Sequence, residues 1–351
     1  MPLRTVLIFA VLAVVLAPSK VLAADTIALA VPLNGPYALL GKQTKAGAEA
    51  AAKALGKTLM VIDDGCEADN GAQLADAVAA SGAQVAIGFL CLESLGAALP
   101  MLKDKAIPTL SIAARADALT LGKAKSGFLF SRISPRDGME AEALARQVLP
   151  LWRKKNFAIV DDGTINARDL AESFRQAAAE AGLKPVFSDT FRPGLDKQNA
   201  LASRLQKAGA THVFFGGSID DAVILSRDAK SYGGLTLALG ESAAPSDPAI
   251  DHGTILALAL ADATLKPEAA AAKLAIGATG IVADNYALLG HAAVEIAAAG
   301  GAVANGAAGP FQTAIGSVAF DENGDLAANP FLLAELKAGA FVPLPKQPAG
   351  Q

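Results

Sequence analysis

The sequence is poor in the residue types that most often carry catalysis. Its 351 residues include three histidines, two cysteines and one tryptophan, and aromatic residues make up only 5% of the chain. The histidines are far apart in sequence, and no nucleophile elbow, phosphate-binding loop or metal-ligand spacing accompanies them. We therefore expect no catalytic residue, no metal site and no cofactor, and we expect that the protein is not an enzyme.

Positive charge is scarce as well. The formal net charge is −4 at pH 7, and lysine and arginine form no basic run longer than three residues. This acidic balance disfavours nucleic acid or an anionic membrane surface as a partner. The acidic stretch 321–325 superficially resembles a calcium loop, but it lacks the later glutamate and the proper spacing, so we interpret it as a turn. We expect a small-molecule solute as partner, and no nucleic acid.

A long apolar run is found only at the start of the chain. Arg4 precedes an unbroken apolar run over residues 6–17, and the segment closes on the small-residue pattern Val21-Leu22-Ala23. The run has about 12 residues, whereas a membrane span needs about 20. We interpret residues 1–23 as a secretory signal peptide and expect an exported protein without membrane insertion. Loss of this segment would remove Arg4 and Lys20 and take the net charge from −4 to −6.

The two cysteines, Cys66 and Cys91, form an even pair, which in an exported protein most simply indicates a disulfide. With about 26 residues in the closed loop, chain entropy gives about 3.5 kcal/mol of stabilisation. A metal site is the first alternative, but two thiols without a nearby histidine are too few ligands. A redox pair is the second, and its spacing differs from this one. We favour a structural bridge.

Short apolar runs alternate with helix-like stretches along most of the chain, with strand starts about 25 residues apart. This spacing is typical of βαβ units that feed a parallel sheet. We expect an α/β fold with two Rossmann-like lobes whose central sheets are mostly parallel. Expected strands cover residues 26–31, 59–62, 84–90, 108–112, 157–160, 185–187, 212–215 and 235–239, and expected helices cover 43–55, 72–80, 94–103, 139–149, 167–181, 195–208 and 220–232.

The last part of the chain does not continue this alternation. Residues 266–276 and 285–299 are typical of helices, whereas 309–320 is typical of extended chain that ends in the turn at 321–325. Such a tail can complete lobes that are already built, so we expect the chain to cross between the lobes more than once. The expected N-terminal lobe is 24–131 plus 263–328, and the expected C-terminal lobe is 132–262 plus 329–351.

Three positions at strand ends are candidates for ligand contact. Ser94 begins a helix after Cys91, and Ala113-Ala114-Arg115 precedes another segment, so backbone N–H groups there should face the ligand edge of the sheet and attract an anion. Arg115 adds a guanidinium group suited to a carboxylate. Glu241 ends a strand of the second lobe, from which it could face the first lobe and bind a cationic group. The alternative is that these strand-end charges are simply solvated.

These segments resemble the periplasmic branched-chain amino-acid (Leu/Ile/Val) binding proteins, which are solute receptors of ABC importers with the type I periplasmic binding protein fold. The resemblance covers essentially the whole mature chain. It rests on Asn34-Gly35-Pro36, Asp63-Asp64-Gly65-Cys66, Ile87-Gly88-Phe89-Leu90-Cys91, Phe214-Phe215-Gly216-Gly217, Gly240-Glu241, Asn285-Tyr286-Ala287-Leu288 and Phe320-Asp321-Glu322-Asn323-Gly324-Asp325.

The resemblance implies a disulfide between the two cysteines and a hinge of three crossovers, about which the lobes close on the solute. It also implies a periplasmic location in a Gram-negative bacterium. The implied partners are the membrane permease and the ATPase of an ABC transporter, and we expect a monomer.

The family's amino-acid pocket carries over only in part. Leu92 stands where the family has a small hydroxyl residue after the second cysteine, and Ala113-Ala114-Arg115 matches a run that normally ends in threonine or serine. Glu241 retains the family's acidic partner for the ligand ammonium. Three further pocket positions lack the family's aromatic residue, and these are Leu40 at the cleft mouth, Asn166 and Ser218.

The missing hydroxyl removes a charge-assisted hydrogen bond worth about 1.5–3 kcal/mol, which makes a plain branched-chain amino acid a poor fit. Two roles are open to Arg115, because it could bind a ligand carboxylate or could fill the cleft and pair with Glu241. We expect a solute-binding subunit of an ABC importer that captures a small carboxylate-bearing or amino-acid-like solute. The alternatives are a ligand-sensing subunit of the same fold that feeds a signalling receptor and, less favoured, an exported enzyme.

Overall fold

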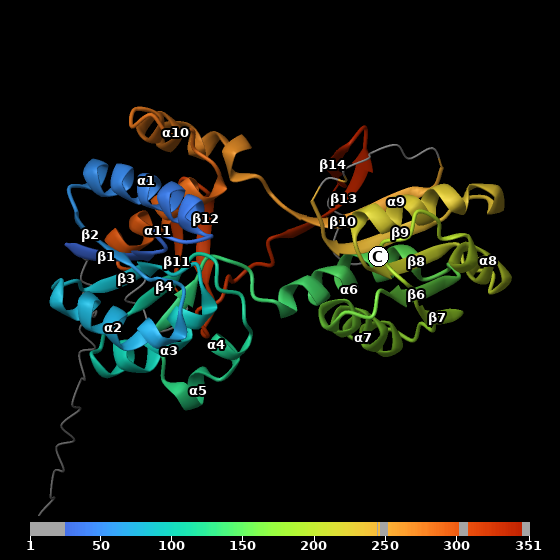
Figure 1. Cartoon of the computed structure of the whole chain (residues 1–351), viewed down its shortest axis with the longest axis horizontal. Helices are drawn as coiled ribbons and strands as arrows, with labels where there is room; N and C mark the ends of the chain where they lie inside the picture. The colour runs from blue at the N-terminus through green and yellow to red at the C-terminus, as the bar shows by residue number, and fades with distance from the viewer. Residues whose placement is uncertain (1–24, 244, 246–251, 302–307, 346–351) are drawn as a thin grey trace, which may run out of the picture.

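A computed structural model describes residues 25–243, 245, 252–301 and 308–345 of the chain. The expected signal peptide, residues 1–23, lies outside these residues. Figure 1 shows two α/β lobes joined by thin connections between them. Within the described ranges, no helix is long and apolar enough to cross a membrane.

The first lobe contains a five-stranded sheet in the order β2-β1-β3-β4-β5, with every neighbouring pair parallel. All four residues of β3 are buried, as expected for a parallel strand covered on both faces. The strands are β1 (Thr26–Val31), β2 (Thr58–Asp63), β3 (Val85–Gly88), β4 (Thr109–Ser111) and β5 (Phe130–Arg132), and the helices are α1 (Ala38–Leu55), α2 (Gly71–Ala80), α3 (Leu92–Asp104), α4 (Ala118–Leu121), α5 (Lys123–Ser126), α10 (Ala270–Gly277) and α11 (Asn285–Ala298).

Helices α1 and α11 pack closely in this lobe because small residues line their contact. A Cβ atom at Gly47 would lie 1.7 Å from the carbonyl oxygen of Ala287, and one at Gly290 would lie 2.2 Å from that of Thr44. The alanine-rich pattern that predicts α1 therefore also permits the last helix of the chain to complete the first lobe (Figure 1).

The second lobe contains a seven-stranded sheet in the order β14-β13-β10-β9-β8-β6-β7. The five strands from β6 to β10 are parallel to their neighbours, and β13 and β14 add an antiparallel edge. The strands are β6 (Phe157–Asp161), β7 (Phe187–Thr190), β8 (His212–Gly216), β9 (Thr236–Glu241), β10 (Thr254–Leu260), β13 (Phe331–Lys337) and β14 (Ala340–Pro343), and the helices are α6 (Gly138–Trp152), α7 (Ile165–Glu180), α8 (Asn199–Lys207) and α9 (Ile219–Asp228).

The two largely parallel sheets confirm the predicted α/β class. Three strands of the second sheet, β10, β13 and β14, were not predicted from the sequence. The antiparallel pair β13–β14 is a hairpin without a crossover helix, so the βαβ spacing gave no sign of it. A further two-stranded sheet pairs β11 (Ala308–Thr313) with β12 (Gly316–Phe320), and the expected turn at 321–325 follows β12 directly.

An aromatic cluster fills part of the second lobe's core. Trp152 is 1% exposed, and its ring lies 6.0 Å from that of Phe157 and 5.9 Å from that of Phe174. His212 packs edge-on against the same indole at 5.4 Å. Burial lowers the pKa of His212, and nearby Lys155 lowers it further. This histidine is therefore a neutral part of the lobe core near pH 7.

The chain passes between the two sheets three times, after β5, after β10 and after β12. A buried ion pair joins the first and third connections, because Arg132 Nε donates to Asp325 Oδ1 at 2.6 Å. The guanidinium group is 0% exposed and the carboxylate 2% exposed. The connections therefore meet at a fixed point on the side of the first lobe.

Candidate ligand-binding cleft

A cavity of about 630 Å³ lies at the carboxyl ends of β6, β8 and β9. The first turns of α6 and α7 form its sides, and Asp117 reaches it from the first lobe. The carboxyl edge of a parallel sheet is where open α/β folds bind ligands. Two of the predicted ligand-binding residues, Asn166 and Glu241, line this cavity.

The charged residues that line the cavity are all acidic. Among the described residues, no lysine or arginine belongs to the lining, although two arginines lie just beyond it. Sequence reasoning found only Glu241 among these carboxylates. The position of Asp162 just after a predicted strand was an available signal, whereas Asp117, Asp137 and Glu140 depend on how the first connection folds. The six acidic residues are Asp117, Asp137, Glu140, Asp162, Asp169 and Glu241.

Arg115 crosses from the first lobe to the second. Its Nη1 donates to Glu241 Oε2 at 2.6 Å, and its Nε lies 3.6 Å from Asp137 Oδ1. The guanidinium carbon lies 5.5 Å from the ring centroid of Phe331, the first residue of β13. Of the two roles considered for Arg115, this structure therefore contains the pair with Glu241.

Glu140 supports the other side of Glu241. Its Oε1 accepts a hydrogen bond from the backbone N–H of Glu241 at 2.7 Å. Burial raises the pKa of Glu140, and the hydrogen bond from Glu241 together with the charge of Arg115 partly opposes the rise. A Cβ atom at Gly240 would lie 2.2 Å from Glu140 Oε1, so glycine at this position permits the two carboxylates to lie beside one strand end.

The polar backbone atoms around Arg115 are engaged within the first lobe. Ser111 Oγ accepts hydrogen bonds from the N–H groups of Ala113 at 3.3 Å and Ala114 at 3.0 Å. The carbonyl oxygen of Ala114 accepts from Arg132 Nη1 at 3.3 Å and from Ser134 Oγ at 3.0 Å. The N–H groups that were predicted to face the ligand edge already have partners, and so does the carbonyl group of Ala114.

Seven of the nine predicted ligand-binding residues lie outside the lining of this cavity. Besides Ala113, Ala114 and Arg115, these are Leu40, Leu92, Ser94 and Ser218. Leu92 is the first residue of α3 and is 41% exposed, whereas Ser94 is fully buried and its Oγ donates to the carbonyl of Cys91 at 3.4 Å. Leu40 is half-buried in the first turn of α1. Ser218 caps α9 by accepting a hydrogen bond from the N–H of Asp221 at 3.1 Å.

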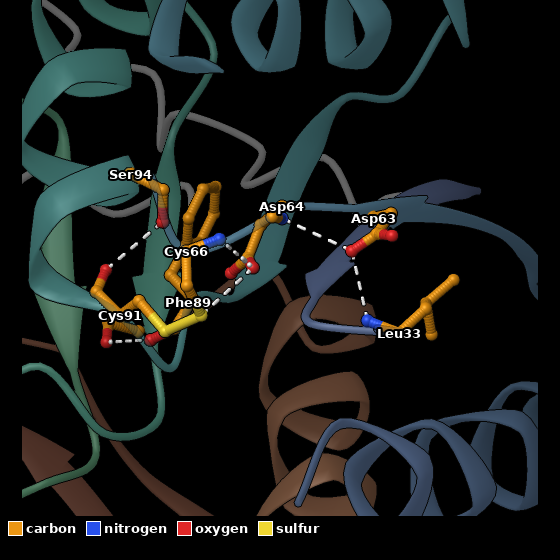
Figure 2. Close-up of a disulfide and its surroundings, with 9 residues drawn as sticks. Leu33, Asp63, Asp64, Cys66, Phe89, Cys91 and Ser94 are labelled. Carbon is orange, nitrogen blue, oxygen red and sulfur yellow. Dashed lines mark hydrogen bonds between the residues drawn. A yellow bond between two sulfur atoms is a disulfide. The ribbon is translucent and has the colours of Figure 1, made fainter. Parts of the chain in front are cut away.

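The two cysteines form the expected disulfide, Cys66–Cys91, with Cα atoms 5.2 Å apart (Figure 2). Asp64 lies beside it and is 1% exposed, with its Oδ1 3.6 Å from Cys66 Sγ and accepting a hydrogen bond from the N–H of Cys66 at 3.1 Å. Burial raises the pKa of Asp64 to about 6. The bridge therefore fixes the ends of β2 and β3 around a buried carboxyl group.

Two α/β lobes, three connections between them and a cavity at the strand ends define a two-lobed solute-binding protein. Residues 26–340 match the model of the periplasmic binding protein family, and the chain belongs to that family. The family consists of non-enzymatic substrate-binding proteins of ABC transporters, which confirms the expectation that the chain is not an enzyme.

Curated relatives and solved structures agree with this assignment. The chain is 30% identical to Leu/Ile/Val-binding protein homolog 3 of Brucella melitensis, covering 91% of this chain and 93% of that protein. It is 31% identical to Leu/Ile/Val-binding protein BraC3 of Rhizobium johnstonii, covering 90% and 93%.

The fold is similar to a substrate-binding protein of Desulfitobacterium hafniense in complex with leucine, with a TM-score of 0.64 and 21% identity over 91% of this chain and 99% of that one. It is also similar to a solute-binding protein of Rhodopseudomonas palustris in complex with benzoate, with a TM-score of 0.57 and 18% identity over 91% and 95%.

Proposed function

We propose that this protein captures a small amino-acid-like solute in the cleft between its lobes and delivers it to a membrane permease driven by an ATPase. The observation that carries this proposal is the position of Glu241, at the carboxyl end of β9 on a cavity of about 630 Å³, with Arg115 facing it from the other lobe. An ammonium group is the natural partner for such a carboxylate. One relative is named a Leu/Ile/Val-binding protein and another a homologue of such a protein, and these names support a solute of this size.

The three connections are the proposed hinge. Closure would bring the first lobe's strand ends toward the acidic residues that line the cavity. The two moving bodies are 24–131 plus 263–328 and 132–262 plus 329–351, except that Arg132 ends β5 and moves with the first. The buried pair of Arg132 and Asp325 holds two of these connections together on the first-lobe side, so rotation would occur beyond it. The proposed site of action is the periplasm, with the protein as a monomer.

In this proposal the solute competes with the ion pair of Arg115 and Glu241. Both side chains are partly exposed, at 29% and 33%, so solvent screening keeps the pair weak, on the order of 1 kcal/mol or less. A solute ammonium that binds Glu241 in a closed, drier cleft gains a stronger charge-assisted hydrogen bond, worth about 1.5–3 kcal/mol.

A titration of the mature protein with small solutes tests the proposal. Isothermal calorimetry with neutral, acidic and basic amino acids and with aromatic acids should detect at least one ligand. Glu241→Gln should weaken the affinity for that ligand by about tenfold or more, because the amide keeps the shape of the side chain and removes its charge. Glu172→Gln, which removes a carboxylate from an exposed pair on α7, is the matched control and should leave binding unchanged. Absence of binding by every solute, or full affinity in Glu241→Gln, would contradict the proposal.

A further inference from the structure

The charges of the cleft do not balance. We propose that the solute is an organic cation, with amine or guanidinium groups in excess of its carboxylates, such as a diamine or a basic amino acid. This inference rests on the proposed function, because it takes the cavity as the ligand cleft and asks only which charge that cleft accepts.

The lining of the cavity carries a surplus of carboxylates. Arg115 pairs with Glu241 and Asp137, and Arg136 lies 3.5 Å from Asp117, so two guanidinium groups stand against six lining carboxylates. The other three lining carboxylates form no ion pair with any described residue, and these are Glu140, Asp162 and Asp169.

The first-lobe groups that were predicted to bind an anion are already engaged with other partners. The N–H groups of Ala113 and Ala114 are taken by Ser111 Oγ. Arg115, which could otherwise receive a carboxylate, is held on the far side of the cleft by two acidic residues and by the ring of Phe331. A carboxylate would have to displace these partners and then lie among the remaining acidic residues, and this repulsion disfavours it.

The lining also supplies further oxygen acceptors for N–H donors. Thr164 and Asn166 stand beside Asp162 and Asp169 at the start of α7. Asp169 is exposed, and its side chain forms no hydrogen bond or ion pair with the described residues, so its carboxylate can turn toward a ligand. A cleft lined by one sign of charge also concentrates counter-ions and speeds their entry. The wall around α7 therefore suits a second ammonium or a guanidinium group.

Size-matched pairs of solutes test the sign of the charge. Lysine and norleucine share a carbon chain and differ by one amine, 2-aminoadipate carries a carboxylate in its place, and arginine and citrulline differ mainly in charge. Cadaverine and agmatine lack the carboxylate. In calorimetric titrations at low salt, we expect at least one cationic member to bind about tenfold more tightly than its neutral counterpart, with 2-aminoadipate weakest. This advantage should shrink in 0.2 M sodium chloride, because salt screens the cleft.

The outcomes separate this inference from the proposed function. If norleucine, citrulline, 2-aminoadipate or an aromatic acid binds as tightly as the cations or more tightly, the cleft is not selective for cations, although the proposed function stands. If no solute of any charge binds, the proposed function itself fails.

Two single variants test independently which sign of ligand charge the cleft prefers. Arg115→Ala removes a positive charge from the cleft, so it should strengthen binding of the cation, whereas weaker binding would show that Arg115 holds a ligand carboxylate and would overturn the inference. Asp169→Asn should weaken binding of the cation by about two- to fivefold, as expected for a partly exposed charge pair. The matched control is Asp104→Asn, at the exposed far end of α3, which should leave affinity unchanged.

Discussion

Replacement of Arg132 by methionine should destabilise the protein more than any change at its surface. The guanidinium group is 0% exposed, and it donates to Asp325 at 2.6 Å and to the carbonyl of Ala116 at 2.9 Å. Methionine fills a similar volume but leaves the buried Asp325 carboxylate with two more distant cations among the described residues, Arg136, whose Nε is 3.8 Å from Oδ2, and Lys123. Removal of one partner from a buried ion pair typically costs about 3–5 kcal/mol.

The free energy of unfolding can be measured by urea denaturation followed by far-UV circular dichroism. For an m-value of about 2 kcal/mol/M, a loss of 3–5 kcal/mol lowers the midpoint by roughly 1.5–2.5 M. The fluorescence of Trp152, the single tryptophan, reports separately on the second lobe's core. Because Arg132 and the loop that it holds belong to the first lobe, the dichroism transition should respond at least as strongly as the fluorescence.

A double variant tests whether the unpaired charge of buried Asp325 causes the loss of stability. Arg132→Met with Asp325→Leu removes both partners, so it should recover part of the stability that Arg132→Met alone loses. Arg175→Met, which breaks an exposed pair with Glu172, is the control and should not shift the midpoint. A midpoint shift below about 0.5 M for Arg132→Met, or a double variant no more stable than the single one, would refute the reasoning.

Three further predictions concern stability. Burial raises the pKa of Asp64 from 3.8 to about 6. The contribution of this group to the free energy of unfolding is therefore complete below pH 3.8 and is lost as the pH rises through 6, and it amounts to at most about 3 kcal/mol. Asp64→Asn should remove this pH dependence from urea midpoints measured between pH 4 and 7, and an unchanged profile would contradict the shift. Replacement of Cys66 and Cys91 by alanine should lower the free energy of unfolding by about 3.5 kcal/mol, because the open loop gains chain entropy in the unfolded state. A loss under about 1 kcal/mol would contradict this entropic stabilisation. Gly47→Ala should cost about 1–3 kcal/mol in thermal or urea unfolding, because its Cβ would overlap the carbonyl of Ala287, whereas Gly56→Ala, with open space around it, tests the left-handed backbone alone.

The local pattern of the sequence was sufficient for most of the secondary structure. Apolar runs of β-rich residues, separated by alanine-rich helical stretches, predicted every parallel strand of the two sheets except β5 and β10. Boundaries were less accurate, since α1 begins at Ala38, five residues before the predicted start, and β7 covers Phe187–Thr190 where 185–187 was expected. The antiparallel strands β13 and β14 escaped prediction because their place in the sheet depends on contacts with β10, which are remote in sequence.

The sequence by itself determined the class of protein, the disulfide and the position of Glu241 at a strand end. These follow from patterns within about 30 residues, or from motifs whose order along the chain is typical of one family. Pairing between distant side chains was decided only by the tertiary structure. Arg115 and Glu241 are 126 residues apart, and their hydrogen bond exists because two separately built lobes place their strand ends face to face.

The acidic wall was decided in the same way. Asp117 comes from the first lobe, Asp137 and Glu140 from the first connection and the helix that follows it, and Asp169 from the next helix. In the sequence alone, each of these residues looks like an ordinary surface acid. Only their shared position around one cavity shows that they belong to the same site. Electrostatic potential adds over distances in space and not along the chain, so only the fold could show that this cleft is negative.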